Sequence, residues 1–286
     1  QMQQQALVPL KNENNNLPPD KRQIKKVLVT GPLADEDNFM TSRYGPNGLE
    51  TVTVLAGLRN YLKGIAEVDY AKGCDIVDAG WPATEILTAH MSEQEKQGIA
   101  EAVAKAGESD VIIDVLGEDE YRTGESRSRT SLDLPGRQQQ LLEALHATGK
   151  PVILVLINGQ PLTVNWANAY IPAILESWFP GCQGGTVIAE TLFGVHNPGG
   201  KLTVTFPKSV GQIELNFPFK PGSHGAQPHS GPNGSGATRV IGELYPFGFG
   251  LSYTTIAYSD LEVSPLQQHT QGDYAIKVNV THTGKL

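Results

Sequence analysis

The chain has 286 residues, a formal net charge of -8 and a pI near 5.4. This length buries enough apolar surface to fold without staples, and we expect one main domain with a smaller appendage. Lysine and arginine are scattered, which excludes the clustered basic surface of a nucleic-acid-binding protein, so we expect no nucleic-acid partner. Cys74 and Cys182 are far apart and have no histidine or cysteine at ligand spacing. They support neither a zinc site nor a disulfide framework. We expect no metal and no cofactor.

Membrane attachment and export are not indicated by this stretch of sequence. No apolar run approaches the roughly 20 residues of a membrane span, and residues 1–5 lack the basic and apolar regions of a signal peptide. We expect no membrane partner. The first residue is Gln1 rather than methionine, and the last strand-like segment, 274–280, stops shortly before Leu286. We expect both ends to be cut from a longer chain.

Short β-branched runs alternate with longer amphipathic runs between residues 25 and 207. This pattern is typical of a parallel sheet covered by helices. The expected fold class is α/β: an open, mostly parallel sheet flanked by helices (an α/β sandwich), followed by a truncated β-sandwich segment. Two almost continuously apolar runs are expected to be the central strands, because both of their faces are covered. These are 111–116 and 152–157, and the other expected strands are 27–30, 67–70 and 173–178.

Three helices are expected between these strands. Ser92 and Glu95 have the spacing of a capping box and predict a helix start. Pro135 suits the first turn of a second helix, which Gly149 would end. A third helix is expected over 185–193.

The composition changes after residue 207. Residues 217–242 are rich in Gly, Pro, His, Ser and Asn without apolar periodicity, which predicts a long irregular loop. Two alternating segments, 258–263 and 274–280, are typical of antiparallel strands. We therefore expect a linker over 1–24, the α/β domain over 25–255 and the beginning of a β-sandwich over 256–286.

The loop after the 111–116 strand is the first candidate for a functional site, because sites in open α/β sheets form where strands end. It carries four acidic residues and three arginines between Gly117 and Arg129. A charged loop is often only a solvated surface, and that interpretation stays open. However, Glu125 follows a flexible glycine, and Arg127 and Arg129 are suited to hold the loop by pairing with its acids, Glu118, Asp119 or Glu120. Glu125 is then the carboxylate left to act.

Five motifs in order carry a family resemblance. They read GESRSRTSLDLPGRQ (124–138), GKPVILVLINGQPL (149–162), WFPGCQGG (178–185), FGVHNPGGKLTVTFP (193–207) and LYPFGFGLSYT (244–254). Together with LKNEN at 10–14, they closely resemble the second domain of family 3 glycoside hydrolases, the β-glucosidase group. The resemblance covers essentially the whole chain.

The resemblance implies a domain of a retaining, exo-acting β-glycosidase that hydrolyses terminal non-reducing β-linked sugars of oligosaccharides or glycosides. Such enzymes place a (β/α)8-type barrel before the α/β sandwich, and often a fibronectin type III-like domain after it. Residues 1–24 are then the linker from the barrel, and 256–286 the incomplete third domain. Matched position by position, the family's acid/base glutamate falls on Glu125.

The resemblance also implies what this chain lacks. The family's nucleophilic aspartate sits in a Ser/Gly-Asp-aromatic motif on the barrel, and neither Asp110 nor Asp260 matches that setting. We therefore expect the nucleophile on a missing N-terminal barrel of the same polypeptide and an inactive isolated chain. Trp81 is a candidate for lining a sugar subsite, and a role as a surface-loop anchor is equally consistent.

The sequence also bears on cellular location and leaves more than one function open. The resemblance implies a periplasmic or secreted protein. A non-catalytic carbohydrate-binding or scaffolding α/β domain remains the alternative to an enzyme domain. A nucleotide-binding domain is disfavoured, because the glycine-rich turns lack the order that a phosphate site requires.

Overall fold

The computed structural model describes residues 2–38, 40–46, 48–213, 215, 217, 240, 242–264 and 274–284. Most of the loop expected at 217–242 lies outside these residues. The chain divides into two compact units, Gln1–Leu251 and Ser252–Leu286. In the described ranges, no helix has the length and apolar character needed to cross a lipid bilayer.

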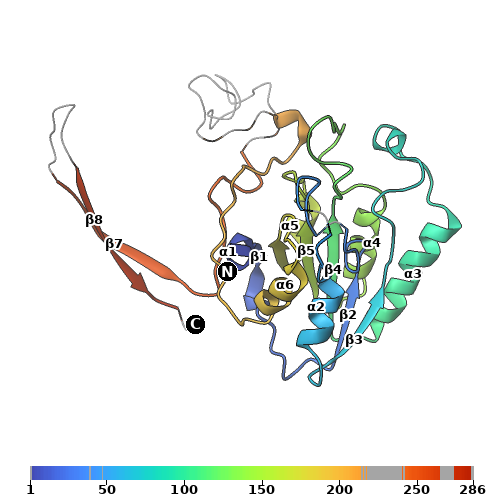
Figure 1. The fold of residues 1–286 in the computed structure, drawn as a ribbon, viewed down its shortest axis with the longest axis horizontal. Coiled ribbons are helices and arrows are strands. Elements are labelled where there is room, and N and C mark those ends of the chain that lie inside the picture. Colours follow the sequence, from blue (N-terminus) through green and yellow to red (C-terminus); the bar gives the residue numbers. More distant parts are fainter. Residues whose placement is uncertain are drawn as a thin grey trace. The chain divides into compact units, whose positions relative to one another are not determined.

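A six-stranded sheet forms the centre of the first unit, with the strand order β1-β6-β5-β4-β2-β3 (Figure 1). All neighbouring pairs are parallel except β1 and β6, which are antiparallel. The two strands expected to be central, β4 and β5, are central, and every residue in both is buried. The strands are β1 (Val8–Asn12), β2 (Lys26–Thr30), β3 (Glu67–Ala71), β4 (Val111–Gly117), β5 (Val152–Ile157) and β6 (Ala173–Glu176).

Strand β1 lies in the segment that the sequence predicts to be a linker. It pairs with the edge of β6, and the register shifts between Pro9 and Lys11. Proline is tolerated at a sheet edge or a bulge because it cannot donate to a neighbouring strand. The N-terminal segment is therefore part of the sheet, and the sheet has six strands rather than the expected five.

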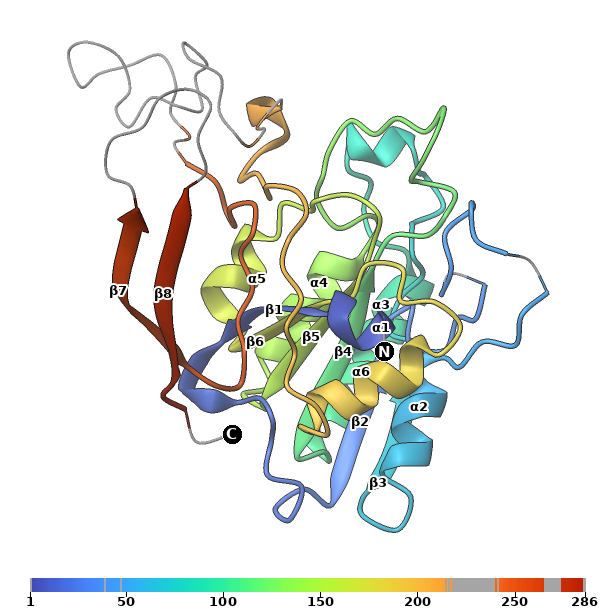
Figure 2. The ribbon, with the colours of Figure 1, turned by 60° about the vertical axis from the view of Figure 1, so that its left-hand side comes forward.

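Helices cover both faces of the sheet. Figures 1 and 2 show α3, α4 and α5 on one face and α2 and α6 on the other. The predicted capping box opens α3: Ser92 Oγ accepts the Glu95 N–H at 3.2 Å, and Glu95 Oε2 accepts the Ser92 N–H at 2.6 Å. The helices are α1 (Met2–Ala6), α2 (Val54–Tyr61), α3 (Glu93–Gly107), α4 (Gln138–His146), α5 (Asn165–Tyr170) and α6 (Gly184–Leu192).

Helix α4 begins later than the sequence predicts. Pro135 does not lie in its first turn, because Gly136 has a left-handed backbone with φ +64°. A side chain at this position would place its Cβ 2.7 Å from Cα of Val77, so only glycine allows the close approach. The turn through Gly136 delays the helix to Gln138.

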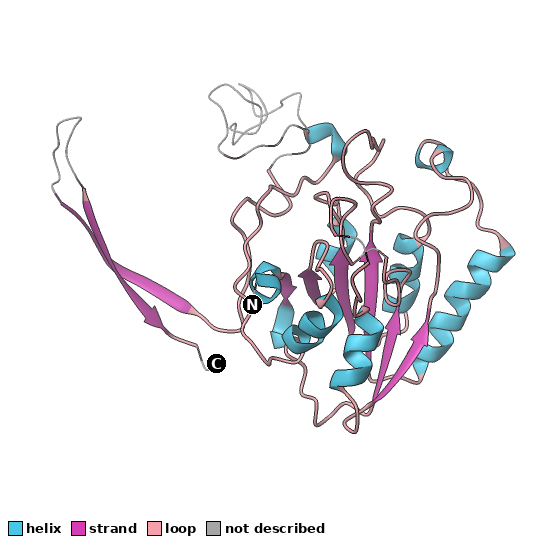
Figure 3. Ribbon diagram, viewed as in Figure 1, coloured by secondary structure: helices cyan, strands magenta, loops and turns pink. Residues whose placement is uncertain are grey.

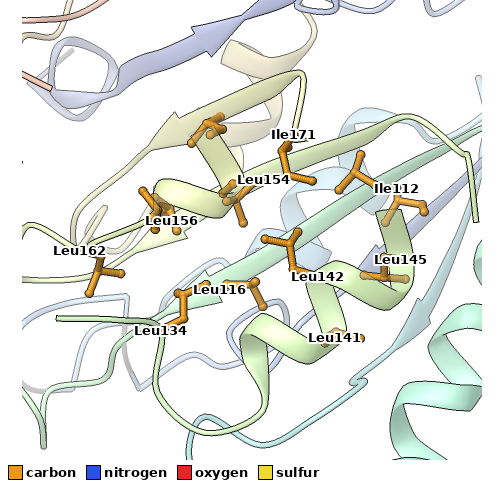
Figure 4. Packing of buried hydrophobic residues seen from close by; sticks show 14 of the residues in the cluster. Ile112, Leu116, Leu134, Leu141, Leu142, Leu145, Leu154, Leu156, Leu162 and Ile171 are labelled. Carbon is orange, nitrogen blue, oxygen red and sulfur yellow. The ribbon is translucent and has the colours of Figure 1, made fainter. Parts of the chain in front are cut away.

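The core between the sheet and α4 is built from leucine and isoleucine. Leu141, Leu142 and Leu145 of α4 face the sheet, where Ile112 and Leu116 of β4 belong to the same cluster (Figure 4). All five side chains are buried. Burial of each such side chain contributes about 1.5–3 kcal/mol to stability, which fixes α4 against the strand that leads to the charged loop.

The second unit contains an antiparallel pair, β7 (Ile256–Ser264) and β8 (Ala275–His282). Both strands were expected from their alternating pattern. All of their residues are exposed. The register shifts between Ser259 and Glu262.

The parallel strands of the first unit all end at one edge of the sheet, where long loops leave it (Figure 3). The loop that follows β4, residues 118–133, lies at this edge and is called the acidic loop below.

Candidate active site

At the start of the acidic loop, the side chain of Gln138 binds both backbone polar groups of Gly117, the last residue of β4. Gly117 donates its N–H to Gln138 Oε1 at 2.7 Å, and Gln138 Nε2 donates back to the Gly117 carbonyl at 2.9 Å. Gln138 is fully buried. A side chain at Gly117 would place its Cβ 1.9 Å from the Ile157 carbonyl oxygen, so this position requires glycine. The loop therefore leaves the sheet from a fixed point.

A buried arginine ties the acidic loop to two carboxylates. Nη1 of Arg129 lies 2.5 Å from Glu118 Oε1, and Nε lies 2.9 Å from Glu85 Oε1. Nη2 donates to the Asp133 carbonyl at 2.8 Å. Such charge-assisted bonds from the rigid guanidinium fork are stronger and more directional than neutral ones. The ion pair between Arg129 and Glu118 is one that the sequence predicts.

Glu85 connects the acidic loop to the segment that contains Trp81. Its Oε1 accepts the indole N–H of Trp81 at 3.0 Å, and its Oε2 accepts the N–H and the hydroxyl of Thr130 at 3.0 and 2.8 Å. Burial alone raises the pKa of Glu85, but the bonds from Thr130 and Trp81 and the charge of Arg129 outweigh it and lower the pKa to about 2. Glu85 is therefore an ionised structural anchor.

Trp81 is held on a second side by Arg122. The Arg122 guanidinium lies 4.5 Å from the centroid of the Trp81 ring, and it also pairs with the buried carboxylate of Asp119. Gln160 Nε2 donates to the Arg122 carbonyl at 2.9 Å and so links the loop after β5 to the acidic loop. These contacts are those of a loop anchor, and contact of Trp81 with a sugar stays a prediction.

Glu125 lies at an exposed part of the acidic loop between two residues with left-handed backbone, Gly124 (φ +103°) and Ser126 (φ +61°). Its N–H donates to Tyr44 Oη at 2.7 Å, and its carbonyl accepts from Arg43 Nη1 at 2.9 Å. Within the described residues its carboxylate forms no hydrogen bond or ion pair. The backbone is thus held, while the carboxylate is available.

Arg127 does not hold the loop as the sequence predicts. Its side chain is exposed and pairs with none of the three expected acids among the described residues. The reason is that other arginines already engage the buried acids: Arg129 pairs with Glu118 and Arg122 with Asp119. Arg127 contributes through its backbone, where its N–H donates to the Gly124 carbonyl at 3.2 Å and closes the turn around Glu125.

A buried polar cluster underlies this edge of the sheet, at the ends of β5 and β6. Asn158 Nδ2 donates to Glu176 Oε2 at 3.2 Å, and the Trp178 N–H donates to Glu176 Oε1 at 2.8 Å. Burial raises the pKa of Glu176 to about 8, and the negative charge of Glu118 adds to the increase. Burial also raises the pKa of Glu118, against the opposing charge of Arg129. The cluster therefore favours a neutral carboxyl at position 176.

The two aspartates considered as nucleophiles have structural roles. Asp110 Oδ2 accepts the N–H groups of Lys25 and Lys26 at 2.7 and 2.9 Å, which caps the start of β2. Asp260 accepts from Asn279 Nδ2 at 2.7 Å across the β7–β8 pair.

Sequence reasoning missed Glu85, Arg122, Arg43 and Tyr44. Arg122 lies inside the charged loop, but no pattern distinguishes it from the other two arginines there. Glu85 and the Arg43–Tyr44 pair come from segments far from the loop in the chain, and they reach it only through the tertiary fold.

The fold and the site define an α/β sandwich domain that presents an exposed glutamate on a loop held in place after strand β4. The sequence model of the protein family described as "Glycosyl hydrolase family 3 C-terminal domain" matches residues 7–253, and the chain belongs to this family.

Similar proteins bear glycosidase names. A "Beta-xylosidase" of Formosa agariphila is 38% identical over 100% of this chain and 38% of its own length. A "Periplasmic beta-glucosidase" of Salmonella typhimurium is 38% identical over 98% of this chain and 38% of its own length. A β-glucosidase structure from Erythrobacter marinus matches with a TM-score of 0.85 and 36% identity, over 99% of this chain and 38% of that one. The chain thus spans well under half the length of these relatives.

Proposed function

We propose that this chain supplies the acid/base carboxylate, Glu125, of a retaining, exo-acting β-glycosidase. The observation that carries the proposal is the contrast within the acidic loop. Glu118, Asp119 and Asp133 accept bonds from other side chains. Among the described residues, neither the Glu120 nor the Glu125 carboxylate forms a hydrogen bond or ion pair, but Glu120 is half-buried, whereas Glu125 is exposed and its backbone is held by Tyr44 and Arg43. The family match and the position of Glu125 in its motif support the same assignment.

The proposed reaction needs two carboxyl groups about 5–5.5 Å apart. One attacks the anomeric carbon and displaces the leaving group, which takes a proton from Glu125. Glu125 then removes a proton from water as the water displaces the enzyme carboxylate and releases the sugar. The attacking carboxylate would come from a barrel domain of the same polypeptide, and the isolated chain would be inactive. The share of each relative that this chain spans leaves room for such a domain.

The proposed substrates are terminal, non-reducing β-linked glucosides or xylosides. This proposal rests on the names of the relatives, which include both β-glucosidases and β-xylosidases. Assays of the full-length enzyme with a matched aryl β-glucoside and aryl β-xyloside would distinguish the two sugars.

The test of Glu125 is the variant Glu125→Ala in the full-length enzyme. Activity on glycosides with poor leaving groups should fall by about 10²–10⁴-fold, because their departure requires a proton. Activated aryl glycosides should still form the glycosyl-enzyme, and added azide should accelerate turnover and yield a glycosyl azide. Glu120→Ala is the matched control, because this half-buried glutamate lies on the same loop. Unchanged kinetics for Glu125→Ala, or an equal loss for Glu120→Ala, would reject the assignment.

A further inference from the structure

Two side chains from the connection between β2 and α2 bind the backbone of Glu125 from both sides. Tyr44 Oη accepts the Glu125 N–H at 2.7 Å, and Arg43 Nη1 donates to the Glu125 carbonyl at 2.9 Å. One residue of the acidic loop thus has both of its peptide groups engaged by side chains from a segment about 80 positions earlier in the sequence. We call Arg43 and Tyr44 the backbone clamp.

The loop and the clamp approach each other closely at Gly124. A side chain at this position would place its Cβ 2.8 Å from Arg43 Cδ and 3.1 Å from Tyr44 Oη. Gly124 also has a left-handed backbone, with φ +103°. The guanidinium of Arg43 lies 5.6 Å from the centroid of the Tyr44 ring, which orients the two clamp residues relative to each other.

The clamp is poorly suited to a purely stabilising role. Tyr44 is 66% exposed, Arg43 and Glu125 are exposed, and hydrogen bonds between exposed groups compete with water. The buried contacts of Arg129, Glu85 and Gln138 already fix the beginning and end of the acidic loop. What the clamp adds is a defined position for one residue, Glu125, whose carboxylate it leaves unbonded.

We propose that Arg43 and Tyr44 are positioning residues for proton transfer by Glu125. The proposal rests on the proposed function of Glu125 as acid/base. A general acid must lie within hydrogen-bond reach of the leaving oxygen, and small displacements of a catalytic group cost large factors in rate. The clamp holds the peptide groups on both sides of the Glu125 Cα, which limits the positions that its carboxyl group can reach.

The test compares leaving groups in the full-length enzyme. We expect Tyr44→Phe, which keeps the ring and removes the accepting oxygen, to lower kcat/KM about five- to tenfold for an unactivated aryl glycoside. For a 2,4-dinitrophenyl glycoside, whose leaving group departs without a proton, kcat/KM should fall less than twofold. The double variant Tyr44→Phe/Arg43→Ala should lower kcat/KM for the unactivated substrate about another tenfold. Replacing Arg43→Ala by Arg43→Lys in this double variant should restore part of that loss, because lysine keeps a donor.

The matched control is Tyr170→Phe, which removes another exposed phenol hydroxyl, on a ring that packs against Trp166 and His146 rather than the acidic loop. Tyr170→Phe should leave kcat/KM unchanged for both substrates. A loss in Tyr44→Phe that is equal for both substrates, or that appears as a higher KM alone, would overturn the positioning role.

A double-mutant cycle separates this proposal from the proposed function. In a Glu125→Ala background, Tyr44→Phe should have no further effect on the unactivated substrate, because the group that it positions is gone. An additional loss there would show that Tyr44 acts on the substrate or the fold directly and would overturn the proposal. If Glu125→Ala alone is unimpaired, the acid/base assignment fails and the clamp proposal fails with it. If only Glu125→Ala is impaired, the clamp proposal alone fails.

Discussion

Nη1 of Arg129 lies 2.5 Å from Oε1 of Glu118, and neither side chain is more than 2% exposed. A pair this deeply buried is costly to break, because the remaining charge has neither water nor a partner. Arg129→Ala should therefore lower the free energy of unfolding by about 3–5 kcal/mol. Arg129→Lys should recover only part of this loss, since lysine cannot reach Glu118, Glu85 and the Asp133 carbonyl with one planar group.

Arg127→Ala is the control for this prediction. Arg127→Ala also replaces an arginine of the acidic loop by alanine, but this arginine is exposed. It should change the free energy of unfolding by less than about 0.5 kcal/mol. Urea unfolding of the three variants measures the difference. Equal effects of Arg129→Ala and Arg127→Ala would contradict the arrangement of the acidic loop.

Glu85 should stabilise the chain in a pH-dependent way. Its folded-state pKa of about 2 is below the ordinary value of 4.5, so its contribution is present above pH 4.5 and is lost as the pH falls toward 2. Glu85→Gln should consequently be destabilising at pH 7, and the gap to the original chain should narrow at pH 3. Urea unfolding at both pH values measures the two gaps. A gap of the same size at both would show that the charge of Glu85 is not what anchors Trp81, Thr130 and Arg129.

The sequence predicts the main strands and helix α3 because their signals are local. Strands β4 and β5 are continuous apolar runs, and the capping box of α3 needs only Ser92 and Glu95. Strand β1 has no such signal. Its sequence, VPLKN, contains a proline and a lysine, and it becomes a strand only by pairing with β6, which lies about 160 residues later. Lys11 is buried there and donates to the Asn168 carbonyl at 2.5 Å.

The candidate site likewise has one part that the sequence predicts and another that only the tertiary structure shows. The density of charge in the acidic loop and its place after a central strand predict the loop as a candidate site, and the resemblance of its motif to the family predicts Glu125 within it. The partners of the charges do not follow from the sequence, because a loop with three arginines and five acids permits many pairings. Tertiary contacts select Arg129 rather than Arg127, and they bring in Glu85, Arg43 and Tyr44 from other segments.

Glu176 should make the chain less stable as the pH rises. Its folded-state pKa of about 8 lies above its ordinary value of 4.5, so its contribution is fully present below pH 4.5 and is lost as the pH rises to 8. Glu176→Gln mimics the neutral acid, and its amide oxygen can still accept one of the hydrogen bonds that Asn158 Nδ2 and the Trp178 N–H donate to Glu176.

The variant should therefore remove a decline of up to roughly 1 kcal/mol per pH unit in the free energy of unfolding between pH 5 and 8. Urea unfolding at several pH values measures the slope. An unchanged slope in Glu176→Gln would assign the pH dependence to other groups.

Helices α2 and α6 approach each other through two glycines, and this contact should tolerate little added volume. A Cβ at Gly57 would lie 2.1 Å from the Gly185 carbonyl oxygen, and a Cβ at Gly185 would lie 1.9 Å from the Thr53 carbonyl oxygen. Both clashes are with backbone, which cannot rotate away as a side chain can. Gly185→Ala should destabilise the chain by about 2 kcal/mol or more, although alanine favours helix. Gly107→Ala, at the end of α3 with no atom within 4 Å of its added Cβ, should instead be neutral or stabilising by about 0.5 kcal/mol. Thermal and urea unfolding should show a loss of stability for Gly185→Ala and none for Gly107→Ala. A Gly185→Ala variant as stable as the original chain would show that α2 and α6 are not packed this closely.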